Sequence, residues 1–459
     1  MWMLPEDFIN TTKATFGEHL WQCYLDAMSE PSPVSIRLNR QKIMECDIFS
    51  EKEDVAWCAD GFYLNQRPQF TFDPLMHAGA YYVQEASSMF LHHVLTHVMG
   101  NDPVIMIDMC AAPGGKSTLA CSMLPEGSLL VCNEPVPQRA SILAENIQKW
   151  GLPNVVATNN YPRDIRKTGI TCDIVLCDVP CSGEGMFRKD EGAIGEWGIQ
   201  NVAKCHTLQR EIVSEAWQCL KQDGIMVYST CTFNTSENEE NVRWICESLG
   251  GEIVSIPIEK EWNITGSLLP HFNDSVYRFI PGKTRGEGLF MAVIQKTGEC
   301  TQRMPKTKST SKGYTRSEWL KNPENYVIEQ NQQTVMATPK AWQPLVSHLS
   351  KELRVIHSGI RLGTIKGKDI IPDQCLAMST ELSGDAFPRT EVDWQSAIAY
   401  LRKEAITLPA DTPRGHILLT YQQLPLGFVK NLGNRANNLY PNEWRIKTTH
   451  IPEELGVRN

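Results

Sequence analysis

The sequence predicts an α/β fold in which a doubly wound parallel sheet lies between a small N-terminal α+β module and a β-rich C-terminal module. Three observations support this prediction. Between Pro103 and Lys296, short and almost continuously apolar runs alternate with amphipathic stretches, the pattern of a parallel sheet covered by helices on both faces. Upstream, residues 1–74 combine a helical pattern with a strand-like run at Val34–Leu38. Downstream, residues 341–459 contain short strand-like runs and few long helical patterns.

Length and composition exclude several classes of protein. The chain has 459 residues, which predicts two to four domains, and its 42% hydrophobic and 21% charged content excludes a disordered or fibrous chain. No apolar run approaches the ~18 residues of a membrane span, which excludes an integral membrane protein. The N-terminus carries Glu6 and Asp7 where a signal peptide carries basic residues. We therefore expect a cytoplasmic protein whose fifteen cysteines are mostly free thiols.

The charge of the chain is unevenly distributed. Its net value of −9 argues at first against a nucleic-acid-binding protein. Residues 1–297 carry 23 Lys and Arg against 37 Asp and Glu, a net of −14, whereas residues 298–459 carry 21 against 16, a net of +5. An acidic body with a basic C-terminal third is expected when one part does chemistry and another holds a polyanion. Chance variation of surface charge would produce the same asymmetry, and charge alone does not decide between the two interpretations.

The elements of the expected sheet follow in order along the chain. The strands are expected at Val104–Met109, Ser128–Cys132, Asn154–Thr158, Asp173–Asp178, Gly224–Ser229, Glu252–Pro257 and Leu289–Gln295. The helices between them are expected at Ser117–Met123, Pro137–Trp150, Thr207–Leu220 and Ser236–Leu249. Ser236 and Glu239 have the spacing of a capping box, which predicts the start of the last helix at Ser236.

Changes in composition predict four segments. Residues 1–74 form the N-terminal module, residues 75–297 carry the sheet, residues 298–340 form a basic linker or loop, and residues 341–459 form the C-terminal region. The linker prediction depends on the run from Arg303 to Lys321, which holds six basic residues and one acidic residue.

The turn after the first strand predicts a ligand site. Asp108 ends that strand, and the small residues of Cys110–Lys116 lead into a helix, so backbone N–H groups can approach a ligand there. A P-loop is excluded, because GxxxxGK[ST] requires glycine where Cys110 stands. Glu134 ends the second strand about 20 residues later, where a carboxylate can accept both ribose hydroxyls of a nucleoside cofactor. A plain turn with a surface glutamate is the competing interpretation.

Two cysteines follow the ends of the fourth and fifth strands. Cys181 lies in the turn Asp178-Val179-Pro180-Cys181, and Cys231 follows Ser229-Thr230. Strand ends of a parallel sheet border the ligand pocket, so a purely structural role for both thiols is the weaker interpretation. A metal site is not expected, because no CxxC motif occurs and His93 and His97 lack a third ligand nearby.

Four stretches in order, DMCAAPGGKS, NEP, DVPCSGEGMF and YSTCTFNTSENEE, resemble the motif series of the Sun-type (Fmu-type) RNA 5-methylcytosine methyltransferases. YYVQEASSM and LPLGFVKNLGNRANNLYPNEWRIK are similar to the RsmF-like branch of that family, which acts on ribosomal RNA. The resemblance is strong over residues 75–296, good over 415–447 and loose over 300–410. It implies a Rossmann-like class I methyltransferase sheet, an N-terminal RNA-binding module and a C-terminal PUA-like RNA-binding module.

The resemblance also implies roles for individual residues. S-adenosylmethionine would be bound by Glu134 through its ribose, by Asp178, and by the loop residues Cys110, Ala111, Ala112, Pro113, Gly114, Gly115 and Lys116. The family places an adenine-contacting acid after the third strand, and here Asn160, Tyr161 and Asp164 stay open for that role. Attack on cytosine is assigned to Cys231, ring contact to Asp178, and product release to Cys181.

Carbon 5 of cytosine is a weak nucleophile, and this explains a thiol in the site. Attack of a thiolate at carbon 6 makes carbon 5 enamine-like, so one difficult step becomes two easier ones. The residues alone do not decide which thiol attacks, because DNA cytosine-5 methyltransferases use the cysteine at the place of Cys181. A cysteine here also differs from the aromatic residue of the [ND]PP[YF] motif in amine methyltransferases, which favours carbon methylation.

RNA contacts are expected from basic residues in both halves of the chain. The candidates are Arg188, Lys189, Lys430, Arg435, Arg445 and Lys447, the last four interleaved with Phe428, Tyr440 and Trp444. Ribosomal RNA is the expected partner, and transfer RNA is not excluded. A non-catalytic RNA-binding assembly factor and a small-molecule methyltransferase also stay open as functions. We expect a monomer without a metal ion and without a membrane partner.

Overall fold

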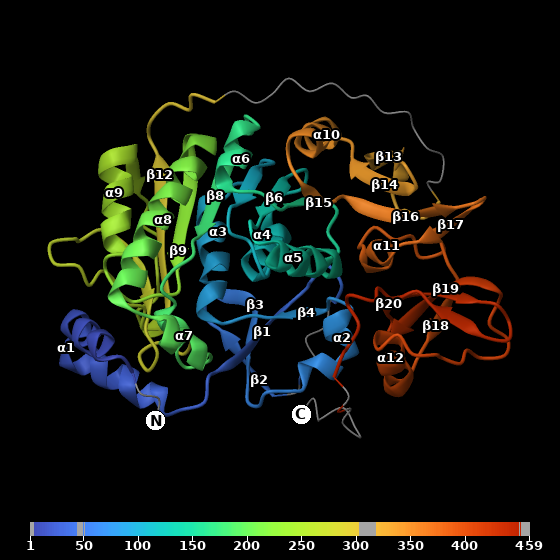
Figure 1. The fold of residues 1–459 in the computed structure, drawn as a ribbon, viewed down its shortest axis with the longest axis horizontal. Helices are drawn as coiled ribbons and strands as arrows, with labels where there is room; N and C mark the ends of the chain where they lie inside the picture. Colours follow the sequence, from blue (N-terminus) through green and yellow to red (C-terminus); the bar gives the residue numbers. More distant parts are fainter. Residues whose placement is uncertain (1–3, 44–48, 50, 303–317, 449, 451–459) are drawn as a thin grey trace.

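The computed structural model describes residues 4–43, 49, 51–302, 318–448 and 450. Its centre is a nine-stranded sheet of order β10-β12-β9-β8-β5-β6-β7-β15, with β11 paired to β12 outside this path (Figure 1). The strands are β5 (Ile105–Asp108), β6 (Leu129–Asn133), β7 (Val155–Thr158), β8 (Cys172–Asp178), β9 (Leu220–Thr230), β10 (Gly251–Ile253), β11 (Tyr277–Phe279), β12 (Leu289–Lys296) and β15 (Val355–Ser358).

The sheet is parallel only in its centre. Strands β5 to β9 pair in parallel, as the sequence predicts, whereas β12, β10 and β15 pair antiparallel with their neighbours. The chain enters β12 from the carboxyl edge of the sheet, where Phe290 lies opposite Thr230 at the end of β9. Strand β12 therefore has to run back along β9, so the doubly wound sheet is parallel in its centre and antiparallel at its edges.

Helices cover both faces of the sheet, as expected for a doubly wound fold. Residues of α3 (Phe90–Val98), α4 (Gly115–Met123) and α5 (Pro137–Trp150) share one buried core with the sheet. The opposite core contains residues of α6 (Pro162–Lys167), α8 (Ile199–Cys219), α9 (Glu239–Leu249) and α10 (Gln343–Glu352). The short helix α7 (Glu191–Glu196) precedes α8.

The predicted capping box at the start of α9 is wrong. The helix begins at Glu239 rather than at Ser236, and its N-cap residue Asn238 makes no side-chain capping bond. The Glu239 carboxylate instead accepts two hydrogen bonds of 2.6 Å from the Arg278 guanidinium. A buried arginine competes successfully for this carboxylate, because its charge needs a partner away from water.

The N-terminal module contains the expected helix and strand. Helix α1 (Glu6–Met28) is kinked at Gly17, whose φ is 70°, and its aromatic side chains share a core with Phe187 and Phe233. A four-stranded sheet of order β2-β3-β1-β4 follows. Its strands are β1 (Val34–Leu38), β2 (Lys52–Val55), β3 (Cys58–Leu64) and β4 (Tyr81–Val83), with α2 (Pro74–His77) before β4. The sheet therefore extends past the boundary expected at residue 74.

The C-terminal region contains two four-stranded sheets. The first consists of β13 (Tyr326–Asn331), β14 (Thr334–Pro339), β16 (Ile360–Lys366) and β17 (Asp369–Pro372). The second consists of β18 (Arg389–Glu391), β19 (Gly415–Tyr421), β20 (Leu424–Asn431) and β21 (Ala436–Asn438). Helices α11 (Gln374–Met378) and α12 (Trp394–Leu401) accompany them. The expected linker therefore ends before β13, whose alternating buried positions mark a strand, and residues 303–317 of the basic run lie outside the described residues.

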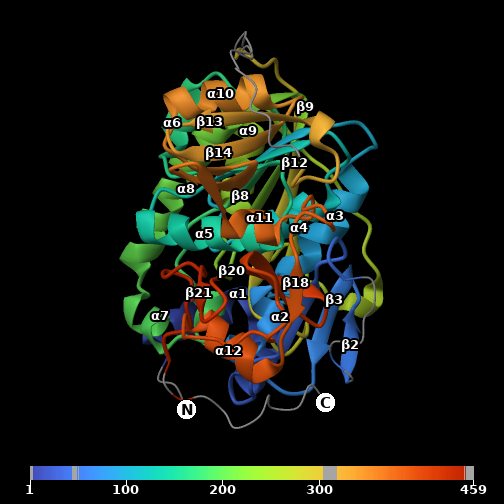
Figure 2. The ribbon, with the colours of Figure 1, turned by 90° about the vertical axis from the view of Figure 1, so that its right-hand side faces the viewer.

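The C-terminal region packs directly onto the other two parts (Figure 2). Strand β15 pairs with β7 and so extends the central sheet. Apolar residues of the N-terminal sheet, such as Ile36 and Phe62, form one core with Ile398 of α12 and Ile417 of β19. The Trp394 indole donates a hydrogen bond of 2.9 Å to the Phe72 carbonyl. The three parts are consequently linked by shared cores and a shared sheet.

Within the part of the chain that the structure describes, no helix combines the length and apolar character needed to cross a bilayer.

Candidate active site

Two loops at the carboxyl edge of the sheet bring the predicted cysteines together. Strands β8 and β9 are neighbours, with Asp178 opposite Ser229, so the loops that follow them lie side by side. The sulfur atoms of Cys181 and Cys231 are 3.2 Å apart, and the Cys231 N–H points to the Cys181 sulfur at 3.4 Å. Both residues are only half-buried. Two free thiols thus share one spot at the edge where a doubly wound sheet binds ligands.

Asp178 links this spot to the loop after β5. One of its carboxylate oxygens accepts from Lys116 Nζ at 2.9 Å, and the other accepts from the Ser229 hydroxyl at 2.7 Å. Burial lowers the pKa of Lys116, but the Asp178 carboxylate outweighs burial and keeps this pKa above its usual value. The ion pair therefore holds the carboxylate in place between the two loops.

The loop Cys110–Lys116 has the small-residue geometry that the sequence predicts. Gly114 adopts a φ of 114°, a left-handed conformation that favours glycine, and helix α4 begins directly after it at Gly115. Carbonyl groups of the loop are held from outside, because Arg139 donates to the Ala112 carbonyl at 3.0 Å and Asn146 to the Pro113 carbonyl at 2.8 Å. The N–H groups of the first turn of α4, which have no acceptor within the helix, begin directly after this loop.

A buried acid lies at the base of the same loop. Asp108 accepts from the Ser117 hydroxyl at 2.6 Å through one oxygen, while its other oxygen is buried without a hydrogen-bond partner among the described residues. Burial raises the pKa of this carboxyl to about 7. An unpartnered buried oxygen is costly unless a ligand completes its hydrogen bonds.

Glu134 lies at the end of β6, next to the loop. Its side chain is only 2% exposed, and it accepts from the Val136 N–H at 3.0 Å and faces Arg139 Nη2 at 3.6 Å. These contacts fix the carboxylate at the position where the sequence predicts a ribose-binding acid.

The three candidates for the adenine contact have different surroundings. Asn160 exchanges hydrogen bonds with the backbone of Arg354, and Tyr161 is 60% exposed. Asp164 accepts from the Tyr161 N–H at 3.2 Å and so caps α6. Asn160 follows the end of β7, and its backbone carbonyl accepts a hydrogen bond of 2.9 Å from the Asn133 side chain. This contact holds Asn160 near the end of β6, where Glu134 lies.

The pKa of Cys181 distinguishes it from an ordinary surface thiol. Its hydrogen bond with Cys231 raises this pKa most, and burial and the charges of Cys231 and Glu237 raise it further. Cys181 therefore keeps its proton at neutral pH.

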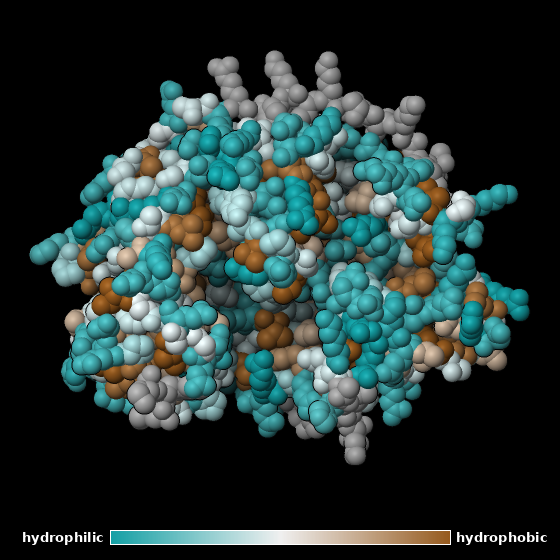
Figure 3. Space-filling model, viewed as in Figure 1, coloured by the Kyte–Doolittle hydropathy of each residue, from teal (hydrophilic) through white to brown (hydrophobic). Residues whose placement is uncertain are grey.

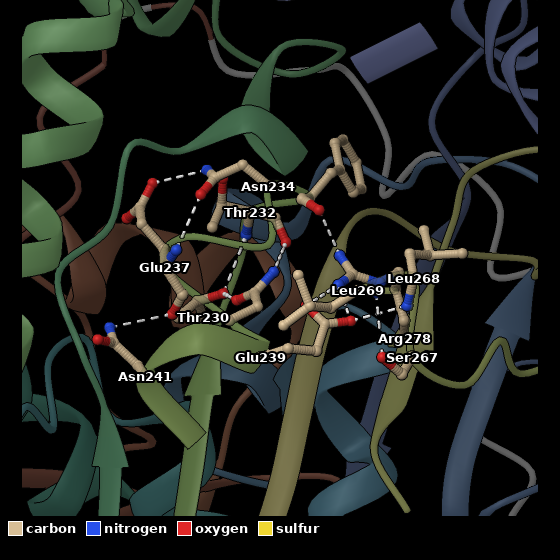
Figure 4. A network of polar contacts seen from close by, with 12 residues as sticks. Thr230, Thr232, Asn234, Glu237, Glu239, Asn241, Ser267, Leu268, Leu269 and Arg278 are labelled. Atoms are coloured by element: carbon tan, nitrogen blue, oxygen red, sulfur yellow. Dashed lines mark hydrogen bonds and ion pairs between the residues drawn. The ribbon is translucent and has the colours of Figure 1, made fainter. Parts of the chain in front are cut away.

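Buried side chains beyond the predicted residues hold the two cysteine loops. Glu184, two residues beyond Ser182, accepts from the N–H groups of Phe233 and Asn234 at 2.5 and 2.9 Å. Glu237 accepts from the Ser182 N–H at 3.0 Å, and Figure 4 shows it beside Asn234. Sequence reasoning missed both acids as site residues, although they belong to the stretches GEGMF and NTSENEE.

A buried ion pair supports the same loop from the other side. Arg278 of β11 and Glu239 of α9 are both fully buried, and Arg278 also donates to the Phe233 carbonyl at 2.5 Å (Figure 4). The backbone two residues past Cys231 is thus anchored by a charged group.

The structure changes the interpretation of Arg188. Its side chain is only 6% exposed and is paired with Glu287 at 3.0 Å, with further bonds to the carbonyls of Ala27 and Gly286. This residue is committed to internal contacts. Lys189 is 32% exposed, and its Nζ lies 3.9 Å from the Glu287 carboxylate.

The basic C-terminal residues are accessible, but most of the aromatic ones are not. Arg435, Arg445 and Lys447 are exposed and Lys430 is half-buried. Phe428 and Tyr440, in contrast, are each only 1% exposed, because they face the core of their sheet. Trp444 remains half-buried against Lys149. The interleaved aromatic residues therefore build the module rather than a stacking surface for bases.

A cavity of about 460 Å³ lies between the N-terminal module and the end of the Cys181 loop. Its lining includes Ser35, Arg67, Gln84, Glu85, Arg188 and Lys189. Figure 3 shows a largely hydrophilic face that is hollowed near its centre.

Family models match three segments of the chain. The model described as 16S rRNA methyltransferase RsmB/F matches residues 96–295. The N-terminal domain of 16S rRNA methyltransferase RsmF matches residues 4–86, and the methyltransferase RsmF PUA domain matches residues 387–446. Along the chain, the three matched segments correspond in turn to the N-terminal module, the central sheet with its helices, and the C-terminal region.

Curated relatives match over almost the whole chain. A protein of Aliivibrio fischeri named ribosomal RNA small subunit methyltransferase F is 30% identical, with 96% of this chain and 97% of the relative covered. A protein of the same name from an Enterobacter species is 28% identical, with 97% and 98% covered.

Solved structures share the fold over part of the chain. A methyltransferase homologue from Pyrococcus horikoshii has a TM-score of 0.52 at 24% identity, covering 64% of this chain and 100% of that one. NSun6 from the same organism, solved with SFG, has a TM-score of 0.53 at 20% identity, covering 64% and 99%.

The residues of the loop fit S-adenosylmethionine. The small residues of the loop leave room for the cofactor, and the first turn of α4 offers N–H groups. The unpartnered Asp108 oxygen is an acceptor for a cationic ligand, and the buried Glu134 carboxylate is an acceptor for ribose hydroxyls. The chain belongs to the RsmF-type family of S-adenosylmethionine-dependent RNA methyltransferases.

Proposed function

We propose that this chain methylates carbon 5 of a cytosine in small-subunit ribosomal RNA through a covalent adduct with Cys231. One observation carries the proposal: the Cys181 and Cys231 sulfur atoms are 3.2 Å apart, beside a strand that ends in Asp178. A scaffold protein has no use for such a thiol pair, and cytosine requires a nucleophile at carbon 6 before carbon 5 can react.

S-adenosylmethionine supplies an electrophilic methyl group, and the chain supplies the rest. The Cys231 thiolate attacks carbon 6 of cytosine and forms a carbon–sulfur bond. Asp178, fixed by Lys116 and Ser229, is the group to which we assign contact with N3 and the exocyclic amine of the ring. Such a preorganised polar group stabilises the charge that develops on attack.

The two thiols have different tasks in this scheme. The hydrogen bond with Cys231, burial and the charge of Glu237 raise the pKa of Cys181, and the family resemblance assigns the attack to Cys231. After methyl transfer water takes the proton from carbon 5, the electron pair of that C–H bond re-forms the double bond between carbon 5 and carbon 6, and the carbon–sulfur bond breaks to release the Cys231 thiolate. Cys181, in contact with that sulfur, assists the release.

Two observations support ribosomal RNA as the substrate. The relatives that match over almost the whole chain are named ribosomal RNA small subunit methyltransferase F, and the C-terminal region carries exposed basic residues such as Arg435 and Lys447. We expect Lys189, which lines the cavity beside the Cys181 loop, to exchange its ion pair with Glu287 for a phosphate near a base that is rotated out of its stack.

A pair of variants tests the chemistry. Cys231→Ala removes the nucleophile and should abolish both turnover and adduct formation. Cys181→Ala should retain attack but block release, so a covalent protein–RNA complex should accumulate in denaturing gels with cofactor and RNA present. Adduct with Cys231→Ala and none with Cys181→Ala would reverse the two roles.

Bisulfite sequencing of ribosomal and transfer RNA from a deletion strain tests the target. We expect one cytosine of small-subunit ribosomal RNA to lose its methyl group, and the wild-type gene should restore it. A methyl group lost from transfer RNA instead would contradict the assignment of the substrate.

A further inference from the structure

Each cysteine loop contains a buried acid that holds the other cysteine loop. We infer that Glu184 and Glu237 are positioning residues that cross between the loops, Glu184 fixing Cys231 and Glu237 fixing Cys181. The catalytic consequences of this inference rest on the proposed function. The positioning itself can be tested separately, because it keeps the Cys181 and Cys231 sulfur atoms close together.

Glu184 belongs to the Cys181 loop but binds the Cys231 loop. Its side chain accepts from the N–H groups of Phe233 and Asn234, the second and third residues after Cys231. The Trp197 indole donates to its other oxygen at 3.0 Å. The next residue, Gly185, donates its N–H to the Cys231 carbonyl at 2.7 Å. The backbone around the proposed nucleophile is therefore held from the neighbouring loop.

Glu237 belongs to the Cys231 loop but binds the Cys181 loop. It accepts from the Ser182 N–H at 3.0 Å, directly after Cys181. The same carboxylate oxygen accepts from Gln209 of α8 at 2.7 Å, and Gln209 also donates to the Pro180 carbonyl at 2.9 Å. Residues on both sides of Cys181 are thus fixed through Glu237.

Asn234 joins the two acids. Its side-chain amide donates to Glu184 at 3.0 Å and to Glu237 at 2.8 Å, and its carbonyl oxygen accepts from the Glu237 N–H at 2.9 Å. Both acids are buried, with exposures of 2% and 0%, and all of the donors named are neutral N–H groups. Hydrogen bonds from neutral donors to a buried carboxylate are strong and directional, so the arrangement favours precise placement over charge balance.

The crossed arrangement predicts crossed phenotypes. Glu184→Gln puts an NH2 group against N–H donors and should loosen Cys231, so adduct formation should slow by about 100-fold with the KM for RNA and for cofactor unchanged. Glu237→Gln should loosen Cys181, so adduct should form normally and accumulate, as proposed for Cys181→Ala. Each acid then behaves like the cysteine of the opposite loop, which general destabilisation would not produce.

Controls separate positioning from misfolding. Glu247→Gln changes an exposed carboxylate on α9 and should leave every step unchanged, and Glu184→Asp or Glu237→Asp should restore part of the rate. Cofactor binding shows that each variant is folded. If a glutamine variant fails to bind cofactor, Asn234→Ala, at a half-buried position, weakens both acids at once and should slow both adduct formation and release.

A chemical probe tests the geometry without catalysis. Diamide takes two electrons and two protons from Cys181 and Cys231 and joins them in a disulfide, which peptide mapping by mass spectrometry detects. We expect rapid formation in the wild type and about 10-fold slower formation in both glutamine variants. Wild-type rates in both variants would overturn the inference even if the cysteine roles hold. Slower rates with unexpected adduct behaviour would support the geometry and contradict the proposed function instead.

Discussion

The two halves of the site are built in different ways. The cofactor half, formed by the loop Cys110–Lys116 and by Glu134, is held by separate single hydrogen bonds, such as those from the Val136 N–H to Glu134 and from Arg139 to the Ala112 carbonyl. The cysteine half is held by a network of the buried carboxylates of Glu184, Glu237 and Glu239 and their partners, and Figure 4 shows the part of it around Glu237 and Glu239. A half that binds a small ligand needs room, whereas a half in which we propose that a covalent bond forms and breaks needs fixed atoms.

The largest effect is expected where the cysteine half is broken. Arg278→Met leaves the fully buried Glu239 without its charged partner, which should lower the free energy of unfolding by about 3–5 kcal/mol. Urea unfolding measures the loss. The double variant Arg278→Met/Glu239→Leu removes both charges and should recover much of the stability. If the double variant is as unstable as the single one, packing rather than the unpaired charge is responsible.

A smaller effect is expected in the cofactor half. Glu134→Gln keeps the shape of the side chain but removes the charge, and should weaken S-adenosylmethionine binding by about 10-fold, since a hydrogen bond to a charged group is stronger than one to a neutral group. Isothermal titration calorimetry measures this. Glu126→Gln, an exposed position, is the matched control. RNA affinity should not change, and equal losses of cofactor and RNA affinity would contradict the assignment.

The smallest effect is expected far from both halves. Arg435→Ala or Lys447→Ala removes one exposed charge of the C-terminal region, which should weaken RNA binding a few-fold and reduce the slope of affinity against salt concentration by about 1. Filter binding at several salt concentrations measures both. Lys167→Ala, at the end of α6, should change neither quantity.

The same contrast explains what could be predicted from sequence. Strands β5 to β9, the glycine-rich loop and the two cysteines follow from local patterns, because each is specified by residues within a short window. Sequence alone could not decide between Ser236 and Arg278 as the partner of Glu239, since Arg278 lies 39 residues away. Arg188 shows the same limit: a basic residue after a motif is expected to meet phosphate, but Glu287 pairs with it across 99 residues.

The edges of the sheet mark another limit. The direction of β12 depends on the edge from which the chain enters it, and the pairing of β15 with β7 joins residues almost 200 positions apart. Composition predicts a linker that extends to residue 340. In the structure Tyr326 and Ile328 are buried and the residues between and after them are more exposed, which is the pattern of a strand. Tertiary partners outweigh local composition at these positions.

The pairing of β15 with β7 has a practical consequence for dissecting the protein. Removing residues 340–459 would not simply detach an RNA-binding appendage. It would leave β7 with unpaired N–H and C=O groups, and would strip the N-terminal sheet of the apolar partners on α12 and β19. An exposed sheet edge beside bare apolar side chains invites self-association. A loss of RNA binding in the shortened chain would therefore reflect self-association as much as a missing RNA contact. Point substitutions are the better way to assign a role to each module.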